Sequence, residues 1–112
     1  MSDHVLCRFV ILALASGVLF AMNARAADQE ALTLMREHKC YVCHADDAAM
    51  AGPAFVDVAA RYGGHANAIA VVAEHVRHGA RGEGPWHMPP HPEVSPEEAK
   101  TIARYILSLD RH

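Results

Sequence analysis

Two cysteines three positions apart, with a histidine directly after the second, constrain this chain more than any other feature. Cys40 and Cys43 are separated by Tyr41 and Val42, and His44 follows. This spacing is the attachment signature of a c-type haem. On one turn of backbone, each cysteine can bond to one haem vinyl group, and the histidine lies where its imidazole can bind the iron. The sequence therefore predicts a chain built around one covalently bound haem.

A cysteine pair at this spacing also occurs in zinc sites and in dithiol redox motifs. A zinc site needs a second pair of ligands, and a redox motif is expected beside a strand and a helix. The sequence has no second cysteine pair and no strand pattern next to the motif. We therefore favour the haem and keep zinc or dithiol chemistry as the alternatives.

Residues 1–26 carry the marks of a secretory signal peptide. A short positive region precedes an apolar run over residues 9–22, and Ala24-Arg25-Ala26 supplies a small-x-small cleavage pattern. We expect cleavage after Ala26, export to the periplasm and a mature domain of residues 27–112 with no stable membrane insertion. The alternative is an uncleaved anchor, but the run is shorter than the roughly 20 residues that a spanning helix needs.

The charge of the chain indicates which kinds of binding partner to expect. The net charge is −3 with neutral histidines, and no basic stripe is present to approach phosphates. We therefore expect no nucleic-acid partner, weakly favour protein partners that have a basic patch, and expect a monomer. A domain this short is marginally stable without help, which a large apolar cofactor at its centre would supply.

Apolar residues recur at helical spacing in four stretches. These are residues 29–39, 55–62, 66–78 and 95–109. The last stretch opens with a capping-box pattern, in which Ser95 can cap and Glu98 can bond back to it. Residues 79–92 are dense in glycine and proline, so we expect no regular element there. The sequence thus predicts one all-α domain of about four helices.

Met88 is the candidate for the second axial ligand of the iron. It lies in the irregular segment among three prolines, which restrict the backbone and help to hold a weak thioether ligand. A methionine ligand also raises the reduction potential relative to a second histidine. Two alternatives stay open: Met88 fills a gap in the core, or His87 or His91 binds the iron instead.

Taken in order, these residues resemble the short class I cytochromes c of bacterial respiratory chains. The resemblance covers nearly all of the mature chain. Its segments are Cys40-x-x-Cys43-His44, Gly52-Pro53-Ala54-Phe55, residues 57–62, and Met88-Pro89-Pro90 before the last helix. It implies a small helical shell around one haem c, with the first and last helices crossing. It also implies a carrier of single electrons between respiratory enzymes, with no catalytic residues.

The resemblance implies a role for each site residue. Cys40 and Cys43 would form the thioether bonds, His44 would be the proximal ligand and Met88 the distal one. The carbonyl group of Pro53 would accept a hydrogen bond from His44.

Two positions depart from the family. The family commonly has a tryptophan five residues before the methionine, where it contacts a haem propionate. Glu83 stands at that position, so Trp86 is the candidate for this contact. Lys39 replaces a glycine that the family often has before the first cysteine.

Two other functions stay open at this point. The same domain could be a dedicated haem c subunit of a dehydrogenase or reductase complex. If Met88 does not bind the iron, a five-coordinate haem could bind small gases or peroxide, with His87 or His91 nearby.

Overall fold

The computed structural model describes residues 2–82 and 85–109 of the chain. Its elements are α1 (Ser2–Glu37), the 3-10 turn η1 (Cys40–Val42), α2 (Phe55–Tyr62), α3 (Ala68–His78), β1 (Ala80–Arg81), β2 (His87–Met88) and α4 (Pro96–Ser108). The structure confirms the all-α class and the four helices that the sequence predicts. The two strands are only two residues long each.

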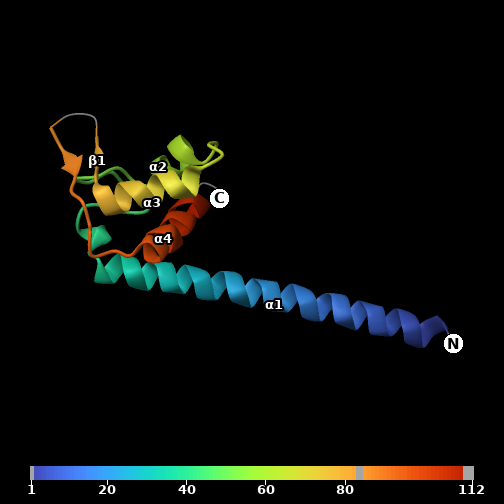
Figure 1. Ribbon diagram of the computed structural model, residues 1–112. Coiled ribbons are helices and arrows are strands. Elements are labelled where there is room, and N and C mark those ends of the chain that lie inside the picture. The colour runs from blue at the N-terminus through green and yellow to red at the C-terminus, as the bar shows by residue number, and fades with distance from the viewer. Residues whose placement is uncertain (1, 83–84, 110–112) are drawn as a thin grey trace.

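The core lies where three helices meet α4. In Figure 1, α3 lies across α4, and the last turns of α1 pass beneath it; α2 also packs on α4. Met35 of α1 and Ile102 of α4 are among the largest fully buried side chains. The other buried core residues are Phe55, Val72, Ala73, Val76, Val94, Ala99, Ala103 and Ile106. Most of them belong to the apolar stripes that the sequence predicts.

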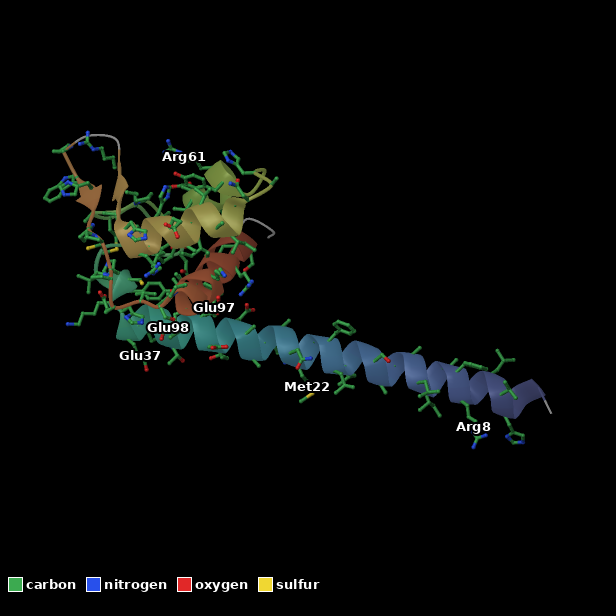
Figure 2. All side chains as sticks on the ribbon, viewed as in Figure 1. Arg8, Met22, Glu37, Arg61, Glu97 and Glu98 are labelled. Carbon is green, nitrogen blue, oxygen red and sulfur yellow. The ribbon has the colours of Figure 1, made fainter. Side chains whose placement is uncertain are left out.

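Helix α1 is much longer than the predicted helix over residues 29–39. It begins at Ser2 and continues without a break to Glu37. Figure 1 shows its first part projecting away from the core, and Figure 2 shows Arg8 and Met22 on that projecting part. Every described side chain from His4 to Glu30 is exposed. By length and composition, α1 is apolar enough to cross a membrane.

The segment between α3 and α4 corrects one prediction. We expected no regular element in residues 79–92, yet β1 and β2 pair antiparallel, with Ala80 opposite Met88 and Arg81 opposite His87. The prolines of this segment lie outside the four paired residues, so they remove no hydrogen-bond donor from the pair.

The capping box of α4 is present as predicted. The N–H of Ser95 donates to Oε2 of Glu98 over 2.8 Å, and the N–H of Glu98 donates to Oγ of Ser95 over 3.2 Å. Figure 2 shows Glu98 at this end of α4, beside the last turns of α1. The capping box therefore fixes the start of α4 beside the last turns of α1.

Candidate functional site

The turn η1 carries the predicted attachment motif. Lys39, just before it, has φ 59° and ψ 30°, which is the left-handed conformation. The N–H groups of Cys43 and His44 both donate to the carbonyl oxygen of Cys40, over 3.2 and 3.1 Å. Both cysteines are free thiols. Two thiols and one imidazole are therefore held on a single short turn of backbone.

The two thiols lie in different surroundings. Cys40 packs against the core, and burial raises the pKa of its thiol. Cys43 is exposed. A group bonded to both sulfur atoms would therefore contact the core at one attachment point and lie near solvent at the other.

Among the side chains whose burial the structure describes, His44 is the only polar or charged one that is buried, with 9% of its surface exposed. Its Nδ1 lies 2.8 Å from the carbonyl oxygen of Pro53. Because a carbonyl can only accept, Nδ1 must carry the proton, and the lone pair is then on Nε2. This is the tautomer and the hydrogen bond that orient a histidine toward a metal.

Gly52 leaves the space that the His44 ring occupies. A Cβ atom at Gly52 would lie 2.4, 2.7 and 2.8 Å from Cε1, Nδ1 and Nε2 of the ring. The N–H of Gly52 donates to the carbonyl oxygen of Cys43 over 2.7 Å, which holds the backbone in this place. Any larger residue here would push the imidazole aside.

One side chain stacks on the imidazole, and two more lie beyond it in series. Phe55 stacks on His44 with ring centroids 4.8 Å apart and planes 18° apart. Tyr41 meets Phe55 edge-on, at 5.8 Å and 83°. The hydroxyl of Tyr41 donates to Oδ1 of Asp46 over 3.0 Å. Burial and this hydrogen bond, in that order, hold the pKa of Tyr41 above its usual range.

Met88 lies half-buried on β2 and packs against the core. Its backbone is paired with Ala80. Gly79, with φ 81°, lies under this strand, and a Cβ atom there would be 2.6 Å from the carbonyl oxygen of Met88. Gly79 ends α3, and its lack of a side chain also allows β2 to approach.

The other candidates lie farther from the core. Trp86 is 70% exposed. It lines an open hollow together with Arg81, His87 and Met88. His87 is exposed. His91 is half-buried, and its Nδ1 is 3.1 Å from a carboxylate oxygen of Glu93. The structure therefore brings Trp86 and Met88 to one hollow, and the tryptophan is the more exposed of the two.

Sequence reasoning missed Tyr41, Asp46 and the contact of Phe55 with His44. In the sequence, Tyr41 is a variable position between the two cysteines, and Phe55 is one apolar position of the helical stretch 55–62. The single sequence signal for Gly52 was its place before a proline, which predicts a turn and not a contact with an imidazole.

Comparison with known proteins identifies the family. The family model for cytochrome c matches residues 29–110. The chain belongs to the cytochrome c family. The resemblance stated from the motifs is thus confirmed, and this is a small class I monohaem cytochrome c.

Relatives of this cytochrome match it over most of their length. Cytochrome c-551 of Pseudomonas aeruginosa is 45% identical over 96 residues, which are 85% of this chain and 89% of the relative. Cytochrome c-552 of Nitrosomonas europaea is 36% identical over 97 residues, again 85% and 89%. The crystal structure of wild-type Nitrosomonas europaea cytochrome c552 superposes with a TM-score of 0.68 at 34% identity, covering 70% of this chain and 99% of that one.

Family membership implies one covalently attached haem c, and the residues of this cytochrome fit it. Two free thiols stand at the required spacing, and a buried imidazole keeps its Nε2 lone pair free. Leu34, Val58, Tyr62 and Met88 are among the side chains that pack on the core but are only partly buried. A flat apolar group can cover such side chains. Within the described ranges, no three His, Cys, Asp or Glu side chains gather as ligands for a bare metal ion.

Proposed function

We propose that residues 27–112 form a periplasmic single-electron carrier between respiratory redox enzymes. In this proposal Cys40 and Cys43 attach the haem, and His44 and Met88 bind its iron. The haem supplies the one-electron exchange between ferric and ferrous iron. The protein supplies the ligands, a low-polarity surrounding and a docking surface. Family membership supports the coarser statement, that this is a monohaem electron carrier.

The observation that carries the ligand assignment is the hydrogen bond between Nδ1 of His44 and the carbonyl oxygen of Pro53. It leaves Nε2 to bind iron and holds the ring at one orientation. Met88 packs against the same core that includes Phe55, the residue stacked on His44. If His44 and Met88 both bind the iron, electron exchange would need little rearrangement, and an open site for gases or peroxide is not expected.

The positions of the two nearby histidines support Met88 over them. His87 neighbours Met88 on β2 but is exposed, whereas Met88 is half-buried. Nδ1 of His91 faces the carboxylate of Glu93 at 3.1 Å. Met88 also packs against the core.

The optical spectrum of the haem-loaded mature protein tests the ligand pair. A methionine–iron bond gives the ferric protein a weak far-red absorption band, which we expect in the parent and expect to be lost in Met88→Ala. Met50→Ala is the matched control, because Met50 is 54% exposed; this variant should keep the band. A parent protein without the band would contradict the Met88 assignment and direct attention to His87 and His91.

The proposed export step concerns the projecting part of α1. The side chains that the structure describes between His4 and Ala26 are exposed and do not pack in the domain, which supports a segment that is removed. Mass spectrometry of the haem protein from a periplasmic extract should find Ala27 as the first residue. An intact amino terminus, recovered with the membrane fraction, would show an anchored cytochrome instead.

We propose that the partners are redox proteins that bind only transiently. The net charge of −3 favours partners with a basic patch. Electron exchange with such a partner should slow as the salt concentration rises. A cytochrome that elutes from a native extract at the size of a monomer would support the free carrier. Elution together with a dehydrogenase or reductase would support the alternative, a dedicated subunit.

A further inference from the structure

We infer that Asp46 and Tyr41 are positioning residues that set the plane of the His44 imidazole by way of Phe55. The inference rests on the proposed role of His44 as an iron ligand. Four side chains lie in series: the carboxylate of Asp46, the phenol of Tyr41, the ring of Phe55 and the imidazole. Asp46 and His44, the first and last of them, are two positions apart in the sequence, so the series begins and ends on the same short segment.

The hydrogen bond to Pro53 does not fix the imidazole plane alone. A carbonyl oxygen accepts over a broad range of directions, so the ring can tilt about the Nδ1–O line while the bond of 2.8 Å is kept. The face of Phe55, at 4.8 Å and 18°, restricts that tilt. Because Phe55 is only 4% exposed, it is itself held by the core. The stacked phenylalanine therefore selects one ring plane.

Tyr41 restricts the rotation of the Phe55 ring. Its ring stands almost perpendicular to that of Phe55, at 83° and 5.8 Å, which is the favoured edge-to-face arrangement. A rotation of the phenylalanine ring would drive it into the tyrosine. The tyrosine in turn cannot swing out while its hydroxyl donates to Asp46 over 3.0 Å.

The backbone next to Asp46 ties the series to α2. The carbonyl oxygen of Ala45 accepts from the N–H of Phe55, and that of Asp46 accepts from the N–H of Val56, both over 2.9 Å. One residue thus holds the start of α2 with its backbone and Tyr41 with its side chain. Groups outside the ligand shell that orient a ligand histidine tune the metal that it binds.

The test compares ferric haem-loaded variants by NMR and electron paramagnetic resonance. The spread of the haem-methyl shifts and the largest g value both depend on the orientation of the axial imidazole plane. We expect Tyr41→Phe and Asp46→Ala to change both readouts by similar amounts. The double variant should change them no further than either single variant, because the two residues act through one bond. Asp46→Asn, which keeps an acceptor oxygen, should restore most of the parent pattern.

Asp47→Ala is the matched control. It removes the same charge from the next residue, whose side chain is exposed, and should leave both readouts unchanged. Equal shifts in Asp47→Ala and Asp46→Ala, or unchanged readouts in Tyr41→Phe, would overturn the inference. Tyr41→Phe loses only one oxygen atom, so it tests the inference even if Asp46→Ala does not fold. If the ligand assignment is wrong, the parent itself lacks the histidine–methionine spectrum, which separates the two failures.

Discussion

Nε2 of His38, just after α1, lies 3.9 Å from Oε2 of Glu98 in the first turn of α4. The Nε2 atom is buried and has no hydrogen-bond partner within the described residues. The same carboxylate oxygen of Glu98 accepts the N–H of Ser95 over 2.8 Å. One carboxylate therefore caps α4 and faces the end of α1, and its ionisation should matter for how the two helices stay together.

The first prediction concerns stability in acid. Hydrogen bonds from Ser95, followed by the charge of His38, lower the pKa of Glu98. A lowered pKa means that the carboxylate stabilises the folded protein above its unfolded value of about 4.3 and loses this contribution as the pH falls through its folded value. The free energy of unfolding of Glu98→Gln should therefore fall less between about pH 5 and pH 3 than that of the parent.

Glu97→Gln is the control for this effect, because Glu97 is exposed and pairs with Lys100, at 3.0 Å. It should keep the parent slope of stability against pH. Denaturant unfolding of the haem-loaded proteins at each pH gives the measurement. Parallel curves for Glu98→Gln and the parent would show that the cap is not linked to proton binding.

The second prediction is a gain in stability at Lys39. Its φ of 59° is left-handed, a conformation that costs a residue with a side chain about 1–2 kcal/mol. Glycine carries no such cost but loses more backbone entropy on folding. We expect Lys39→Gly to raise the free energy of unfolding by about 0.5–1 kcal/mol. Lys39→Ala keeps the unfavourable φ and should give no gain; an equal gain in both variants would point to the lysine charge instead.

The third prediction concerns the space under the imidazole. Gly52→Ala places a methyl group within 2.4 Å of the His44 ring. Overpacking of this kind costs about 1–3 kcal/mol. We expect this loss in the free energy of unfolding, together with altered haem spectra. Gly64→Ala is the control, because nothing lies within 4 Å of its added Cβ atom. Normal spectra in Gly52→Ala would mean that the turn relaxes without moving the ligand.

The fourth prediction concerns the loop that presents Met88. Gly79 has φ 81° and ψ 171°, a region that is essentially reserved for glycine and that costs other residues about 1–3 kcal/mol. In Gly79→Ala we expect the far-red band to disappear at a lower temperature than the helical circular dichroism, because β2 loosens before the helices unfold. Loss of both signals together, at the parent temperature, would contradict this.

Local signals made much of the fold predictable. The capping box at Ser95 and Glu98 and the apolar stripe of α4 depend only on residues within a few positions of each other, and both are present. The pairing of β1 with β2 was not predictable in this way. Its four residues carry no strand pattern, and the approach depends on the conformation of Gly79, which a sequence does not show.

The candidate site also has a part that the sequence predicts and a part that it does not. The attachment motif stands out because its chemistry demands one fixed spacing, and Met88 stands out because prolines surround it. The series from Asp46 to His44 depends on where α2 meets η1 in space. The residue types of Tyr41 and Phe55 do not predict this contact, because aromatic residues at helix starts and in turns usually pack in the core.

The contact between α1 and α4 also bears on the order of events during folding. Met35 and Ile102 belong to the same core, although they come from opposite ends of the domain. Such a contact forms only after the entropy of closing a long loop has been overcome. A chain that leaves the cytoplasm amino terminus first presents Cys40 and Cys43 well before residues 96–108. If the chain is exported as proposed, the unfolded chain would pass through an interval in which its thiols are accessible and its core cannot yet close.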